Sequence, residues 1–116
     1  MQFGTYIRER RESLRIENPQ FSLRQVAGRV GIEPAYLSKI EREEFAPPGE
    51  GTIRAIAREL NEDADVLLAL AGKVSTDLQD VIRRRPRLFA ELIRQLKDSP
   101  DNAVLRIVRE VRDGKL

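Results

Sequence analysis

The sequence predicts an all-α fold, with five short helices in residues 1–72 and a short helical C-terminal extension in residues 73–116. Three observations predict it. Apolar residues recur at the three- and four-residue spacing of helices, and no segment shows the alternation typical of strands. Residues that commonly begin or end helices lie at the ends of these apolar repeats. The composition, with 41% hydrophobic and 34% charged residues, is typical of a globular chain rather than a disordered one.

The first two helices are expected within residues 3–30. The first is Phe3–Glu17, with its apolar side toward the core, and the string Asn-Pro-Gln that follows breaks it. Ser22 is a good N-cap for a second helix, Leu23–Val30, because its hydroxyl can accept a hydrogen bond from a free backbone N–H. Gly31 ends this helix, since glycine tolerates the left-handed conformation of a tight turn.

Similar signals place the next three helices at residues 34–44, 53–60 and 63–71. Pro34 suits the first turn of the third helix. The string Ala-Pro-Pro-Gly at 46–49 is typical of a loop, and Thr52 is expected to cap the fourth helix. Gly72 stops the fifth helix, and we place the boundary between two domains there.

Residues 73–116 are expected to form two or three further helices. Their apolar stripes are too long to leave in water, because each such side chain gains roughly 1.5–3 kcal/mol on burial. They must therefore pack on their own domain or on a second copy of the chain, and we interpret this segment as a dimerisation segment. The stripe residues are Leu78, Val81, Ile82, Leu88, Phe89, Leu92, Ile93, Leu96, Val104, Leu105, Ile107, Val108 and Val111.

Composition excludes several classes of site. The chain has no cysteine and no histidine, so a zinc finger, a disulfide framework and a Ser-His or Cys-His nucleophile pair are ruled out. No glycine-rich phosphate loop or metal-ligand spacing is present, so we expect no enzyme, no cofactor, no metal and no small-molecule ligand. No apolar run approaches the roughly 20 residues that cross a bilayer, and missing cysteines fit the cytoplasm.

Charge is unevenly distributed along the chain, although the net charge is only +2. The net charge is +3 over residues 1–42, −5 over residues 43–72 and +4 over residues 73–116. Such asymmetry is typical of a protein that docks on phosphates in a fixed orientation.

The segment from Ser22 to Arg42 is the most informative part of the sequence. Ala27 is small enough to let a second helix cross close by, and Gly31 supplies the turn between the two helices. The apolar side chains then fall on the inward sides of two short helices joined by a three- to four-residue turn. Such a unit can present its second helix to the major groove of DNA.

This segment resembles the Xre family of lambda-repressor-like helix-turn-helix domains, and the resemblance covers roughly residues 3–72. Ala-Tyr-Leu-Ser-Lys-Ile-Glu-Arg, residues 35–42, is close to the family's commonest recognition helix. Two departures stand out. The connection Arg15–Phe21 is longer than the family's usual turn, and Glu43 stands where the family often has glycine.

The resemblance implies site residues on the recognition helix and around it. The expected base-contacting residues are Glu33, Pro34, Ala35, Ser38 and Lys39, and the expected phosphate-contacting residues are Ser22, Arg24, Tyr36 and Arg42. Tyr36 has the alternative of packing in the core, and Glu33 that of favouring the helix dipole. Arg29 is either a phosphate contact or a solvated charge. Arg11 and Glu41 match family positions that pair across the first and third helices.

The expected function is a transcriptional repressor that binds double-stranded DNA at a palindromic operator as a homodimer. The alternative is an antitoxin or protein-interaction module that uses the same fold without specific DNA reading. The basic run at residues 83–87 is favoured by the helix dipole at a C-terminus, or provides an extra phosphate contact or a site for an acidic partner.

Overall fold

The computed structural model describes residues 2–114 and divides by backbone contacts into two units. The N-terminal unit comprises residues 1–75 and the C-terminal unit residues 76–116. Within the described residues the secondary structure is entirely helical, without strands. The all-α class predicted from the sequence is therefore confirmed. Each unit is described below by itself.

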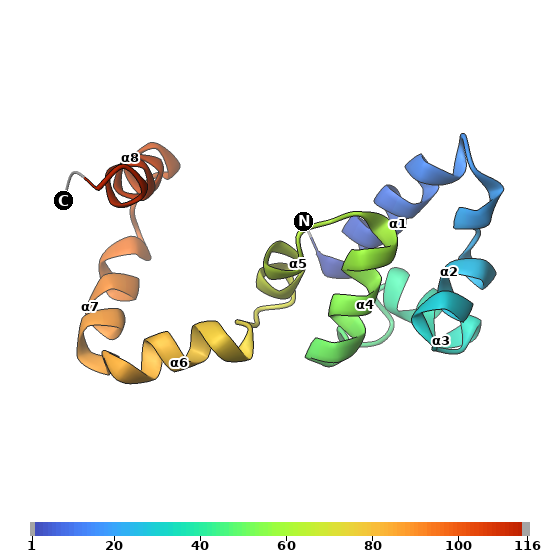
Figure 1. Cartoon of the computed structure of the whole chain (residues 1–116), viewed down its shortest axis with the longest axis horizontal. Helices are drawn as coiled ribbons and strands as arrows, with labels where there is room; N and C mark the ends of the chain where they lie inside the picture. The colour runs from blue at the N-terminus through green and yellow to red at the C-terminus, as the bar shows by residue number, and fades with distance from the viewer. Residues whose placement is uncertain (1, 115–116) are drawn as a thin grey trace. The chain divides into compact units, whose positions relative to one another are not determined.

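The N-terminal unit contains α1 to α5 and a short 3₁₀ helix, η1 (Figure 1). Their bounds are α1 Phe3–Arg15, η1 Pro19–Phe21, α2 Leu23–Val30, α3 Pro34–Glu41, α4 Glu50–Leu60 and α5 Ala64–Leu70. Every α-helix contributes apolar side chains to one core, in which α4 provides the largest share. The core residues are Phe3, Ile7, Val26, Ala27, Leu37, Ile40, Ile53, Ile56, Ala57, Leu60, Leu67 and Leu68.

Helices α1 and α3 end earlier than the sequence predicts, and α5 is one residue shorter than expected at each end. α1 ends at Arg15, two residues early, and Asn18 caps η1 by accepting a hydrogen bond from the Gln20 amide at 2.9 Å. α3 ends at Glu41 rather than near Glu44, because Glu43 adopts a left-handed backbone conformation with φ of 64°. A residue in that conformation cannot continue a right-handed helix.

The expected start of the fourth helix was wrong. Thr52 is not its cap, because α4 already begins at Glu50 with Gly49 as the N-cap residue. Glu50 lies in the first turn, where a carboxylate interacts favourably with the helix dipole, and it pairs with Arg54 one turn later at 3.4 Å. These interactions favour a helix that begins three residues before the expected start at Ile53.

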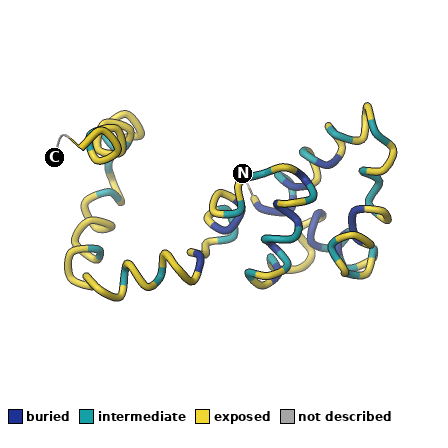
Figure 2. The backbone as a smooth tube through the Cα atoms, in the orientation of Figure 1, coloured by how far each residue is buried: buried dark blue, intermediate teal, exposed yellow. Residues whose placement is uncertain are grey.

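The C-terminal unit contains three helices, α6 Thr76–Arg84, α7 Pro86–Leu96 and α8 Asp101–Arg112. All three are amphipathic, yet none of them contains a buried residue (Figure 2). Leu88, Ile93 and Val111 expose 69%, 59% and 61% of their surface. An apolar groove of about 460 Å³ runs between α7 and α8, lined by Leu92, Leu96, Val104, Ile107, Val108, Val111 and Arg112.

Candidate nucleic-acid interface

The unit α2–turn–α3 forms as the sequence predicts. Ser22 is the N-cap of α2, and its hydroxyl oxygen accepts a hydrogen bond from the Gln25 amide at 3.3 Å. Gly31 ends α2 with φ of 88°, which glycine adopts without a steric cost. Only Gly31, Ile32 and Glu33 separate the two helices, and Pro34 occupies the first position of α3. The result is a tight helix-turn-helix.

Ala27 explains how closely the helices of this unit approach one another. Its side chain is completely buried in the core between neighbouring helices. A larger side chain at this position would push α2 outward, because protein cores are close-packed. The small residue singled out in the sequence therefore sets the approach of the helices in this unit.

α3 has a buried face and an outer face. Leu37, Ile40 and Glu41 point into the core. Of the residues expected to contact bases, Glu33 and Ala35 are exposed, whereas Pro34, Ser38 and Lys39 are half-buried. None of the five is buried, and their expected contacts with bases stay a prediction. Side chains of the turn that follows α3 cover part of this face.

Phe45 is the residue of this face that the sequence analysis missed. The Lys39 Nζ lies 5.0 Å from the centroid of the Phe45 ring, within the range of a cation–π contact. The Tyr36 ring centroid lies 6.0 Å from the same ring, and Tyr36 also packs against the core. Packing, the alternative left open for Tyr36, is thus observed. Its expected phosphate contact stays a prediction.

The residues expected to contact phosphates differ in the ion pairs and hydrogen bonds that they already form within the chain. Arg24 is exposed and forms no ion pair with any residue in the described range 2–114. Arg42 is exposed but lies 3.2 Å from Glu44, and its Nε donates to the Ser38 carbonyl at 3.4 Å. The Ser22 oxygen accepts the cap hydrogen bond, which leaves its hydroxyl proton available for a second partner.

A buried ion pair fixes α3 against α1, as the family resemblance implied. Arg11 Nε donates to Glu41 Oε2 at 2.8 Å and Nη2 donates to Glu41 Oε1 at 2.9 Å, a two-pronged arrangement. Both residues are buried, with 3% and 2% of their surface exposed. The hydrogen bond to Glu41 raises the pKa of Arg11 above its usual value, so the guanidinium stays charged. The expected pairing is confirmed.

A second anchor joins the end of α3 to the start of α1. Glu43 Oε1 accepts hydrogen bonds from the Thr5 amide at 2.7 Å and from the Thr5 hydroxyl at 3.2 Å. The Glu43 carboxylate therefore caps α1 from a distant part of the sequence. Gly4 makes room for this contact, because a Cβ atom at Gly4 would overlap the Ile40 carbonyl oxygen and lie 2.7 Å from Glu43 Oε1.

Comparison with known proteins agrees with this geometry. The family profile described as "Helix-turn-helix domain" matches residues 12–73, more than half of the chain. The chain belongs to the helix-turn-helix domain family. This supports the resemblance to Xre-type regulators that residues 35–42 indicated.

Two curated relatives are each described as an uncharacterized HTH-type transcriptional regulator, from two strains of Mycobacterium tuberculosis. Each is 36% identical to this chain over 69 residues, which is 60% of this chain and 45% of the relative. The chain thus spans about half the length of the curated relatives it matches. No solved structure matches.

The long connection after α1 is held to the helix-turn-helix domain by two arginines. Arg11 Nη1 donates to the Phe21 carbonyl at 3.2 Å, and the Arg29 guanidinium lies 5.5 Å from the Phe21 ring centroid. Arg29 also pairs with Glu59 of α4 at 2.7 Å. Arg29, which the sequence left open, is therefore a bridge from α2 to the connection and to α4 rather than a free charge.

Within residues 2–114, no three acidic side chains are grouped so that they could hold a metal ion. No helix in the same range is long and apolar enough to cross a membrane.

Proposed function

We propose that the chain is a DNA-binding regulator of transcription that places α3 in the major groove of double-stranded DNA. The observation that carries this proposal is the outer face of α3 on a rigid frame. The inner face of α3 is buried. The Arg11–Glu41 ion pair and the Glu43 cap join α3 to α1 at two separate places. Rigid placement matters because base-edge hydrogen bonds tolerate little displacement.

On this proposal the residues of α3 divide into two groups. Lys39 and Ser38 hydrogen-bond base edges, with Lys39 suited to guanine, and Ala35 contacts a thymine methyl group. Glu33 and Pro34 lie beside them at the start of the helix. Phe45 limits the positions that the Lys39 ammonium group samples before binding, which lowers the entropy cost of ordering it.

Phosphates flanking the groove are bound by Ser22, Arg24, Tyr36 and Arg42. Arg24 is the strongest of these candidates because it has no competing carboxylate. Arg42 must exchange Glu44 for a phosphate, so it contributes less. These contacts orient the helix and carry no sequence information by themselves.

We further propose that two chains act together as a homodimeric repressor on a palindromic operator. One recognition helix reads few base pairs, and a second copy doubles the footprint. The apolar faces of α7 and α8, open to solvent in one chain, are the surface through which the copies would associate. Half-sites would then lie about one helical turn of DNA, roughly 34 Å, apart.

The test begins with a random-sequence duplex library, from which the chain selects its preferred site. Binding to that duplex and to a scrambled duplex is then measured by fluorescence anisotropy over a range of salt concentrations. Lys39→Ala should lose roughly 1–3 kcal/mol on the selected site and little on the scrambled one. Arg24→Ala should weaken both duplexes alike and lower the salt slope by about one unit.

Arg58→Ala is the matched control, since Arg58 is an exposed arginine of α4. It should leave both affinities close to those of the unaltered chain. Equal losses for Lys39→Ala on both duplexes would move Lys39 to the phosphate group. If the chain binds no duplex in a salt-dependent way, the proposal is wrong and a protein-interaction module is favoured.

A further inference from the structure

The junction between α6 and α7 concentrates positive charge. Arg83 and Arg84 end α6, Arg85 is the N-cap residue of α7, and Arg87 follows Pro86 in its first turn (Figure 1). All four arginines are exposed. Arg83 pairs with Asp80 at 3.2 Å, whereas the other three form no ion pair with any residue that the structure describes.

Helix electrostatics explain only half of this cluster. Cations are stabilised at a helix C-terminus, so Arg83 and Arg84 are well placed at the end of α6. Arg85 and Arg87 lie at the opposite pole, the N-terminus of α7, where cations are unfavourable. No acidic residue lies in the first turn of α7, and no side chain caps it. The helix dipole therefore does not account for these two arginines.

We propose that this junction is a second phosphate-binding surface, in which Arg84, Arg85 and Arg87 bind the backbone of duplex DNA. Guanidinium groups match phosphate oxygens in a two-pronged geometry, and the free N–H groups at the start of α7 favour an anion at the same place. On this proposal the three arginines contact phosphates and no base edges, so this surface adds affinity but no sequence preference.

The proposal rests on the proposed function, which already brings duplex DNA to the chain. It also agrees with the charge of the segment, since residues 73–116 carry a net charge of +4 while residues 43–72 carry −5. Phosphate contacts would then come from both units of each chain. The junction would retain the protein on DNA while α3 samples sequences.

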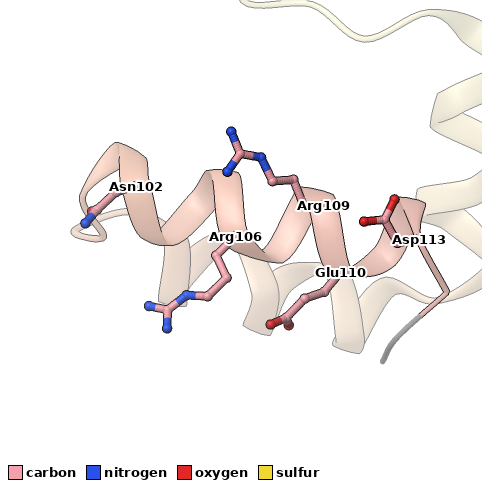
Figure 3. Close-up of a pocket in the computed structure, with 5 residues that line it drawn as sticks. All are labelled: Asn102, Arg106, Arg109, Glu110 and Asp113. Carbon is pink, nitrogen blue, oxygen red and sulfur yellow. The ribbon is translucent and has the colours of Figure 1, made fainter.

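The polar face of α8 provides the contrast within the same unit. Figure 3 shows Arg106 and Arg109 extending from α8 together with Glu110 and Asp113. Charges of both signs share this face, and Arg112 lies 3.4 Å from Asp113. A phosphate would meet a carboxylate there as well as an arginine, so this face should contribute little to DNA binding.

The test compares two triple variants of the full chain that remove the same charge from the same unit. Arg84→Gln/Arg85→Gln/Arg87→Gln removes the junction, and Arg94→Gln/Arg106→Gln/Arg109→Gln removes three arginines elsewhere. Each lost phosphate contact lowers the salt slope of duplex binding by about 0.9. The junction variant should therefore lose about two to three units per chain, equally on a selected and on a scrambled duplex. The control should lose less than one unit.

A third variant, Arg84→Lys/Arg85→Lys/Arg87→Lys, guards against misfolding of the junction. It keeps the charge and should keep most of the salt slope. The proposal is overturned if the lysine variant loses as much of the salt slope as the junction glutamine variant. It is also overturned if the junction and control glutamine variants lose the same amount. If the unaltered chain binds duplex and the junction variant keeps its slope, this inference alone fails and an acidic protein partner is favoured. If the unaltered chain binds no duplex, the proposed function fails with it.

Discussion

The helices of the two units are similarly amphipathic, but their apolar faces differ in burial. In the N-terminal unit every α-helix buries apolar side chains in a common core. In the C-terminal unit α6, α7 and α8 bury none among the described residues, and their apolar faces stay open (Figure 2). Periodicity therefore identifies which face of a helix is apolar but does not tell what covers it.

Polar contacts differ in the same way. In the N-terminal unit they join residues far apart in sequence, such as Arg11 to Glu41 and Glu43 to Thr5, and Arg10 Nε donates to the Leu60 carbonyl at 3.2 Å. Among the described residues, the side-chain hydrogen bonds and ion pairs of α7 and α8 join positions no more than four apart, as between Gln95 and Glu91. Contacts between distant residues therefore specify the first unit, whereas the polar contacts within α7 and α8 are local.

The largest effect should come from breaking the buried ion pair. Arg11→Ala leaves the Glu41 carboxylate buried without its partner, and it removes the donor to the Phe21 carbonyl. We expect a loss of about 3–5 kcal/mol in the free energy of unfolding, measured by urea denaturation. Arg29→Ala, which breaks the more exposed pair with Glu59, should cost no more than about 1 kcal/mol. Equal losses would contradict the distinction between the two pairs.

A methyl group at Gly4 should have the next largest effect. The Cβ of Gly4→Ala would overlap a backbone oxygen, which cannot move without shifting α3 against α1. We expect a loss of about 1–3 kcal/mol in thermal or urea denaturation. Gly28→Ala is the matched control, because nothing lies within 4 Å of its Cβ and the site is in the interior of α2. That change should stabilise the protein by up to about 1 kcal/mol.

Substitutions in the C-terminal unit should change the affinity of dimerisation rather than the stability of the N-terminal unit. Leu92→Glu places a charge in the groove between α7 and α8, and it should weaken dimerisation more than about tenfold in sedimentation analysis. The melting temperature of the N-terminal unit should not change. Ala90→Glu adds the same charge to an exposed position of α7 outside the groove, and the dimer should persist. An unaltered chain that sediments as a monomer at high concentration would refute the dimer hypothesis.

Local signals predicted much of the fold from the sequence. The Ser22 cap, the Gly31 turn and the inward positions of Val26, Leu37 and Ile40 depend on neighbouring residues, so they are legible in the sequence. The roles of Phe45 and Glu43 depend on contacts made only after folding, and no local pattern marks them. The one signal available for Glu43 was the family resemblance, which implies glycine at this position and therefore a left-handed conformation.

Glu43 should give the smallest and most discriminating effect, because it has two opposing contributions. Its left-handed backbone costs roughly 1–2 kcal/mol, and its carboxylate offsets this by capping α1. Glu43→Ala keeps the strained conformation and loses the cap, so we expect a loss of about 1 kcal/mol. Glu43→Gly loses the cap but relieves the strain, so its stability should lie within about 1 kcal/mol of the unaltered chain. The difference between the two variants in thermal denaturation then measures the strain alone. If glycine proves as destabilising as alanine, the carboxylate contact with Thr5, rather than backbone conformation, decides the residue at this position.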